Sequence, residues 1–98
     1  MDDLNVIVYT MKGCPFCVEL KNLLQESKID FFDRDIHEYE EEYQLFTEVT
    51  KSDFIPALMI IEIYGDDYKS FLYVPDRDYY ELTEAVDLVK KHKKKILN

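Results

Sequence analysis

The spacing of apolar and polar residues predicts an alternation of strands and helices along the chain. Residues 6–9 form a continuous apolar run rich in β-branched side chains, which is typical of a buried parallel strand. Pro15 suits the first turn of a helix, because the N–H that it lacks would have no partner there. Leu20, Leu23 and Leu24 follow at helical spacing, so we expect a helix over residues 15–28.

The alternation continues through the middle of the chain. Residues 30–36 predict a second strand. Tyr39, Tyr43, Phe46 and Val49 then recur at intervals that predict the buried face of a second helix, whose outer face is acidic. The most apolar strand is expected at residues 57–63, and a hairpin signal at residues 65–67 connects it to a strand at residues 69–74.

A terminal helix is expected after Asp78, which forms a capping-box pattern with Glu81 three residues later. Its apolar face contains Leu82, Ala85, Val86, Val89 and Ile96. The resulting order is β-α-β-α-β-β-α, with two parallel strands joined by a helix and followed by an antiparallel hairpin. We therefore predict a single α/β domain over residues 1–98, with a four-stranded mixed sheet and three helices.

The chain has 98 residues and is acidic: 12 Lys and Arg against 21 Asp and Glu give a formal net charge of −9. Five lysines lie in residues 90–95, so the rest of the chain has 7 basic residues against 21 acidic ones. This charge repels phosphate backbones, and the longest apolar run, residues 57–61, is too short to cross a bilayer. The N-terminus lacks a signal-peptide pattern. We expect a cytoplasmic monomer that binds neither nucleic acid nor membranes.

The candidate chemistry lies in the segment Cys14-Pro15-Phe16-Cys17, where the first strand meets the first helix. Structural disulfides are uncommon in the cytosol, so this pair is interpreted as functional. Two intervening residues on the first helical turn bring the two sulfur atoms within bridging distance. We expect Cys14, at the helix N-cap, to be an exposed nucleophile, and Cys17 to be a shielded resolving thiol. Phe16, between them, is expected to be exposed.

A free thiol has a pKa of about 8.5, so lowering the pKa to about 7 requires about 2 kcal/mol of preferential stabilisation of the thiolate. The helix dipole supplies about 0.3–1 kcal/mol, and charge-assisted hydrogen bonds add about 1.5 kcal/mol or more. Lys12 is expected to contribute a nearby cation. These local terms favour thiol–disulfide exchange: Cys14 attacks a substrate disulfide, and Cys17 then releases the reduced substrate.

Two other interpretations of the cysteines were weighed. Both could be small buried core residues, although their spacing and the intervening proline disfavour this. A zinc site would need two further ligands, and the two histidines, His37 and His92, lack partner spacing. We therefore expect no metal.

These residues resemble the glutaredoxins of the thioredoxin-fold superfamily. The resemblance rests on residues 6–10 leading into the Cys14–Cys17 segment, on Asp35 at the end of the second strand, and on Ile55-Pro56 before the third. It implies the thioredoxin-like fold and a dithiol oxidoreductase that transfers electrons in cell redox homeostasis. The implied substrates are protein disulfides or glutathione mixed disulfides, and glutathione is the implied co-substrate.

The resemblance also implies which residues surround the reactive pair. Pro56 is expected to be cis and to face Cys14 across a groove, which leaves the backbone of Ile55 free to pair with a peptide or with glutathione. The substrate or glutathione site is implied to contain Lys12, Pro15, Phe16, Ile55, Pro56, Arg77 and Asp78.

Two departures from the family pattern concern glutathione. Met11 stands where glutaredoxins usually have a basic residue, and Lys12 follows one position later. The Gly-Gly pair that cradles a glutathione carboxylate is missing from residues 74–78, where Arg77 is the candidate substitute and the following helix N-terminus offers N–H groups.

These departures leave two alternatives open. The first is a redoxin that serves ribonucleotide reductase and is itself reduced by a flavoenzyme of the thioredoxin-reductase type. The second is a redox-inert interaction module on a thioredoxin fold, in which Cys14 would alkylate at the rate of an ordinary thiol.

Overall fold

The computed structural model describes residues 2–97 and confirms the predicted order of strands and helices. None of the helices within this range is long and apolar enough to cross a membrane. The elements are β1 (Asp2–Thr10), α1 (Pro15–Glu26), β2 (Phe32–Asp35), α2 (Glu40–Thr50), β3 (Ala57–Tyr64), β4 (Asp67–Tyr73) and α3 (Leu82–Leu97).

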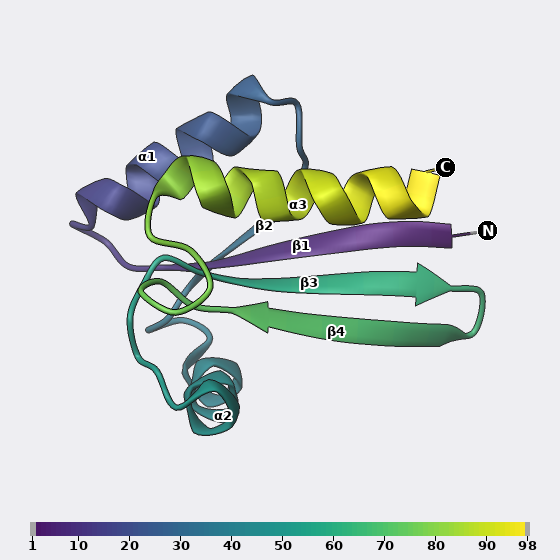
Figure 1. Cartoon of the computed structure of the whole chain (residues 1–98). Helices are drawn as coiled ribbons and strands as arrows, with labels where there is room; N and C mark the ends of the chain where they lie inside the picture. The colour runs from purple at the N-terminus through teal and green to yellow at the C-terminus, as the bar shows by residue number, and fades with distance from the viewer. Residues whose placement is uncertain (1, 98) are drawn as a thin grey trace.

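The strands form one mixed sheet in the order β2-β1-β3-β4, as Figure 1 shows. β1 and β2 are parallel, with Ile7 opposite Phe32, whereas β3 is antiparallel to both β1 and β4. β1 starts at Asp2, before the apolar run, because its first residues pair with the end of β3 at Tyr64. The predicted four-stranded mixed sheet is therefore confirmed.

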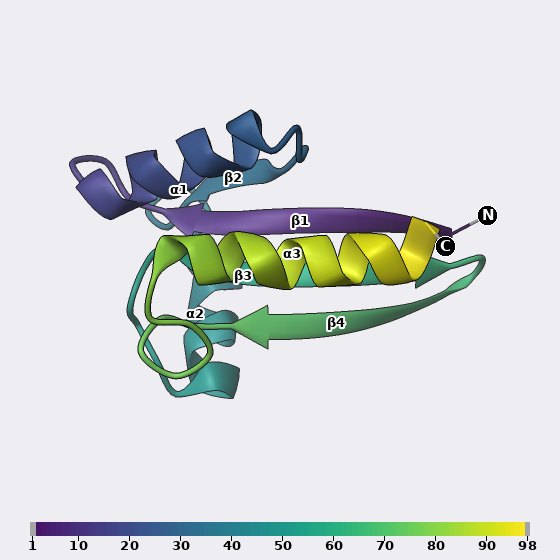
Figure 2. The same ribbon diagram turned by 45° about the horizontal axis from the view of Figure 1, so that its top comes forward.

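Different helices cover the two faces of the sheet (Figures 1 and 2). Val6 and Val8 of β1 belong to the core under α1 and α3. Ile7 and Tyr9 point to the other face and pack in a second cluster with Phe46 of α2. Because successive side chains of a strand alternate between faces, one continuous apolar run supplies both clusters. The central position of β1 fixes the place where α1, and with it the cysteine pair, begins.

The predicted buried face of α2 is wrong at Tyr39 and Val49. Tyr39 is the N-cap, before the first helical turn, and is 42% exposed. Tyr43 packs against the cluster that contains Phe46, and Thr50 is buried, whereas Val49 is 72% exposed. An α-helix turns by about 100° per residue, so Tyr43, Phe46 and Thr50 centre on a direction from which Val49 is displaced by about 90°. Thr50 is tolerated inside because its hydroxyl donates to the carbonyl of Phe46 at 2.8 Å.

The predicted capping box between Asp78 and Glu81 is also wrong. The helix α3 begins at Leu82, and the carboxylate of Glu84 accepts hydrogen bonds from the N–H groups of Tyr80 and Glu81. The carboxylate of Asp78 points elsewhere and accepts from the N–H of Val74 at 2.8 Å. Asp78 therefore stabilises the connection between β4 and α3. Glu84, and not Asp78, provides the side-chain acceptor for the free N–H groups at the start of α3.

Candidate active site

Cys14 and Cys17 lie where β1 passes into α1, and they form a disulfide with a Cα–Cα distance of 5.2 Å. Cys14 is the N-cap of α1, and Pro15 follows in the first turn. The turn between β1 and the N-cap uses Gly13 at φ +75°, a left-handed conformation that glycine adopts without a steric penalty. The predicted proximity of the two sulfur atoms is confirmed.

The two cysteines differ in their exposure to solvent. Cys14 is 9% exposed, whereas Cys17 is 1% exposed. Cys14 is the more exposed of the two, as expected, but the prediction that it is an exposed side chain is wrong for this disulfide-bonded form, in which Cys14 is buried beside Cys17. Phe16 is 65% exposed, as predicted.

The first turn of α1 directs polar hydrogen atoms at Cys14. The N–H of Cys17 donates to the sulfur of Cys14 at 3.2 Å, and the first turn contains no acidic residue. A thiolate at Cys14 would receive this hydrogen bond as a charge-assisted one, in addition to the positive end of the helix dipole. The site therefore stabilises the anionic form of residue 14.

An ion pair holds α1 against β2. The ammonium of Lys21 lies 2.8 Å from the carboxylate of Asp33, which also accepts from the hydroxyl of Thr10 at the end of β1. Burial alone would raise the pKa of Asp33, but the hydrogen bonds from Lys21 and Thr10 lower it. Asp33 is therefore ionised at neutral pH and fixes the direction in which α1 leaves the sheet.

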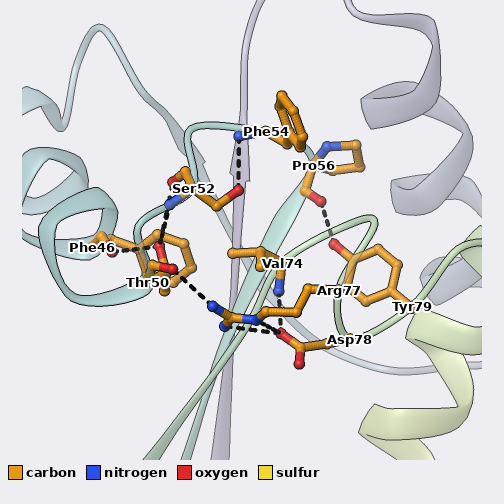
Figure 3. A network of polar contacts seen from close by, with 9 residues as sticks. All are labelled: Phe46, Thr50, Ser52, Phe54, Pro56, Val74, Arg77, Asp78 and Tyr79. Carbon is orange, nitrogen blue, oxygen red and sulfur yellow. Dashed lines mark hydrogen bonds and ion pairs between the residues drawn. The ribbon is translucent and has the colours of Figure 1, made fainter.

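The peptide bond between Ile55 and Pro56 is cis, as expected. Pro56 is buried, and the hydroxyl of Tyr79 donates a hydrogen bond to its carbonyl oxygen (Figure 3). Burial and the neighbouring Asp78 carboxylate raise the pKa of Tyr79, so this hydroxyl stays protonated. Tyr79, in the segment that precedes α3, therefore connects this segment to the residue before the start of β3.

Arg77 and Asp78 belong to a network of polar contacts that joins two segments (Figure 3). The guanidinium of Arg77 donates to the carbonyl of Thr50 at 2.7 Å and lies 3.1 Å from the carboxylate of Asp78. These contacts join the end of α2 to the connection after β4. The sequence predicted that both residues belong to the substrate or glutathione site and did not indicate this structural role. The one sequence feature consistent with it is their position in the turn-rich segment at residues 75–78.

A groove of about 770 Å³ runs between the start of α1 and the cis-proline loop. Phe16, Ile55 and Pro56 line it, so the structure brings together three of the residues predicted to contact substrate. The other predicted contact residues are not part of its lining: Lys12, Pro15, Arg77 and Asp78. Cys14 and Cys17 do not line it either, and Phe16, which stands between them in the chain, connects the groove to the pair.

A buried carboxylate that sequence reasoning missed lies under α3, remote from the cysteines. Glu62 of β3 is 0% exposed, and as an ionised acceptor it receives hydrogen bonds from Tyr64 and from Nδ1 of His92. The ammonium of Lys95 lies 3.3 Å from it, and the hydroxyl of Tyr73 lies 2.6 Å from Nε2 of His92. The sequence feature that could have indicated this buried carboxylate is Glu62 itself, the single charged residue within the most apolar strand.

The histidines are not arranged around the cysteines. Within residues 2–97, no three His, Cys, Asp or Glu side chains are placed to hold a metal ion. His92 pairs with Glu62, and His37 is exposed in the loop before α2.

Comparison with known proteins identifies a family and solved structures that resemble this chain. A family model described as Glutaredoxin matches residues 6–62, a range that contains both cysteines and the cis-proline. No curated protein matches the chain. Thioredoxin from Trichomonas vaginalis superposes with a TM-score of 0.57 at 15% identity, over 93% of this chain and 78% of that one. Glutaredoxin from Brucella melitensis gives a TM-score of 0.48 at 20% identity, over 93% and 84% of the two chains. The first likeness shows the thioredoxin-like fold.

Proposed function

We propose, from the premise that this chain belongs to the glutaredoxin family, that Cys14 is the nucleophile and Cys17 the resolving cysteine of a dithiol cycle. Membership of that family, together with the cysteine pair, makes the protein a thiol–disulfide oxidoreductase. The observation that carries the assignment of roles is the position of Cys14. It is the N-cap of α1 and is 9% exposed, whereas Cys17 is 1% exposed.

In the proposed cycle the reduced protein transfers two electrons to a substrate disulfide. The Cys14 thiolate attacks one substrate sulfur, a Cys14–substrate disulfide forms, and the other substrate sulfur leaves as a thiolate that takes a proton from water. The Cys17 thiol loses its proton and attacks the sulfur of Cys14. The second substrate thiolate then leaves, and the Cys14–Cys17 disulfide remains for a dithiol or a two-thiol reductant to reopen.

The chemistry of the N-cap supports Cys14 as the attacking group. The N–H of Cys17 is already directed at its sulfur at 3.2 Å. Such a charge-assisted hydrogen bond contributes about 1.5–3 kcal/mol, and the helix N-terminus adds about 0.3–1 kcal/mol. Together they supply the roughly 2 kcal/mol needed to bring a thiol pKa from about 8.5 to about 7.

The assignment is tested by the pH dependence of alkylation of the reduced protein, followed by mass analysis of the two cysteines. We expect Cys14 to react first and its rate to rise with an apparent pKa below that of a free thiol. The Cys17→Ser variant serves as the matched control because it retains only the proposed nucleophile. Reaction of Cys17 ahead of Cys14, or a Cys14 profile with the pKa of a free thiol, would contradict the assignment.

We propose protein disulfides and glutathione mixed disulfides as the substrates and, from family membership, glutathione as the reductant, in a cytoplasmic monomer. A second candidate reductant is a flavoenzyme of the thioredoxin-reductase type, with ribonucleotide reductase among the proteins served. The contacts of Arg77 favour this second candidate. Its guanidinium already binds the carbonyl of Thr50 and the carboxylate of Asp78, so it is not free to bind a glutathione carboxylate in place of the missing Gly-Gly pair. Reduction of the Cys14–Cys17 disulfide by each reductant separates the two.

A further inference from the structure

The groove that Phe16 lines next to the cysteine pair contains acidic side chains. Its lining contains four carboxylates and no lysine, arginine or histidine. The carboxylates come from four separate segments: Glu19 of α1, Asp53 before the cis-proline, Asp76 after β4 and Glu81 before α3. All four are exposed, and none forms an ion pair within the described part of the chain. An occupant of the groove therefore meets four carboxylates that no ion pair of the described residues neutralises.

Basic groups near the groove do not compensate this charge. Arg77 follows Asp76 directly, but its guanidinium is engaged with the carbonyl of Thr50 and the carboxylate of Asp78. Lys12, near the start of α1, is not part of the lining. The ionised side chains that line the groove are therefore all negative, and the opposing charge that the described residues place beside them is the partial positive charge at the starts of α1 and α3.

The same groove exposes large aromatic surfaces. Phe16, Phe54 and Tyr80 line it and are 65%, 55% and 73% exposed. Aromatic faces attract ammonium and guanidinium groups, and they also cover the aliphatic stems of lysine and arginine side chains. The aromatic lining is an observation independent of the carboxylates, and both favour a long cationic side chain next to apolar neighbours.

We propose that this groove binds a basic and apolar peptide segment around the substrate cysteine. This inference rests on the proposed function, because it names the substrate class of the same reactive pair. The enzyme then prefers protein disulfides flanked by lysine or arginine. It disfavours glutathione disulfide, whose glycine and γ-glutamyl carboxylates outnumber its ammonium groups. Because the ionised groups of the lining are carboxylates, charge complementarity favours a cationic peptide over an anionic one.

The test uses pre-reduced protein in a single turnover, so that no reductase or free glutathione enters the measurement. Two peptides with a central cysteine between leucines, one flanked by lysines and one by glutamates, are each joined by a disulfide to mercaptoethanol. We expect the lysine peptide to react about tenfold faster at low ionic strength, as two or three charge pairs at about 7 Å would give. The ratio should shrink as salt shortens the Debye length from about 30 Å to about 3 Å.

Two charge-matched variants locate the source of the preference. The groove variant carries Glu19→Gln, Asp53→Asn, Asp76→Asn and Glu81→Gln. The control variant neutralises four exposed carboxylates outside this lining: Glu26→Gln, Asp30→Asn, Glu48→Gln and Asp66→Asn. We expect the groove variant to react with the two peptides at rates within about twofold of each other, and the control variant to keep most of the preference. Far-ultraviolet circular dichroism checks that both variants are folded.

The outcomes separate this inference from the proposed function. Equal rates for the two peptides, with normal reduction of neutral hydroxyethyl disulfide, overturn the basic-peptide preference and leave the oxidoreductase assignment intact. A preference that survives in the groove variant and disappears in the control variant also overturns it, because the charge would then act from another surface. Failure of the pre-reduced protein to react with any of these disulfides overturns the proposed function and this inference together.

Discussion

Replacing the buried carboxylate of Glu62 with an amide should strongly destabilise the fold without touching the cysteines. In the native protein Glu62 is 0% exposed and receives hydrogen bonds from Tyr64 and His92, with Lys95 3.3 Å away. Glu62→Gln keeps the shape but replaces one acceptor oxygen by an NH2 group. That NH2 group must face one of the existing donors, so Tyr64 or His92 has to switch from donating to accepting, and the negative charge that strengthens these contacts is lost.

The size of the effect follows from the charge on the acceptor that the substitution removes. A hydrogen bond to a charged group contributes about 1.5–3 kcal/mol, whereas the side chain of Lys95 is 58% exposed and its ammonium stays hydrated when its partner is removed. We expect Glu62→Gln to lower the free energy of unfolding by about 2–3 kcal/mol at about pH 7. This is a large share of the roughly 5–15 kcal/mol that stabilises a typical domain.

The pH dependence provides a signature that a packing defect would not have. Burial alone would raise the pKa of Glu62, but hydrogen bonds from Tyr64, His92 and Lys95 lower it from 4.5 to about 2. The folded state therefore holds this proton more weakly than the unfolded state, so the stabilisation is complete above pH 4.5 and is lost as the pH falls towards 2. The difference between wild type and variant should shrink over this window by at most about 1.4 kcal/mol per pH unit.

Urea unfolding followed by circular dichroism and tyrosine fluorescence measures this difference, since the chain has 8 tyrosines and no tryptophan. Glu48→Gln is the matched control: Glu48 is exposed on α2, and we expect a change within about 0.5 kcal/mol. The reasoning is refuted if Glu62→Gln changes the stability as little as the control at neutral pH. A difference from wild type that stays constant between about pH 6 and about pH 3 would refute the ionic origin.

Three further outcomes are expected. Cys14→Ser should abolish reduction of protein disulfides, whereas Cys17→Ser should accumulate a mixed disulfide that mass spectrometry detects; full turnover by the first variant would exclude the proposed cycle. Tyr79→Phe leaves the buried carbonyl of Pro56 without its partner, so urea unfolding should show a loss of about 1–3 kcal/mol, and an unchanged midpoint would show that the contact is dispensable. Gly65→Ala places a β-carbon at φ +62° where no atom lies within 4 Å; the cost should be purely conformational, about 1 kcal/mol by the same measurement, and a stabilised variant would contradict it.

The features that could be predicted from the sequence are those set by short-range patterns. The apolar run at residues 6–9, Pro15 at a helix start and the hairpin signal at residues 65–67 each depend on a few neighbouring residues, and the structure confirms the elements that they predict. The proximity of the sulfur atoms of Cys14 and Cys17 follows from their spacing on one helical turn. The cis bond before Pro56 was implied by family resemblance, because no local pattern distinguishes it from an ordinary proline at a strand start.

The features that the sequence did not predict depend on contacts between distant segments. Arg77 was assigned to a ligand because its tertiary partner, the carbonyl of Thr50, lies 27 positions away and is a backbone atom that no sequence pattern marks. Glu62 and His92 are 30 positions apart and come together only when α3 lies on the sheet. Val49 fits a helical period but falls outside the narrow strip of α2 that the sheet covers.

The direction of α3 gives the whole molecule an electric polarity. Its first residues border the acidic groove, and the helix then runs along the sheet to the opposite end of a molecule whose longest extent is 37 Å (Figure 1). Its lysines at positions 90, 91, 93, 94 and 95 gather at that far end. The two ends are separated by several Debye lengths of about 8 Å, so a neighbour senses each of them separately. Asp2, Asp3, Asp66 and Asp67 lie at that same far end, so the lysines there mainly offset carboxylates. The groove end is left as the unneutralised one, and a positively charged protein is drawn towards it until added electrolyte screens the attraction.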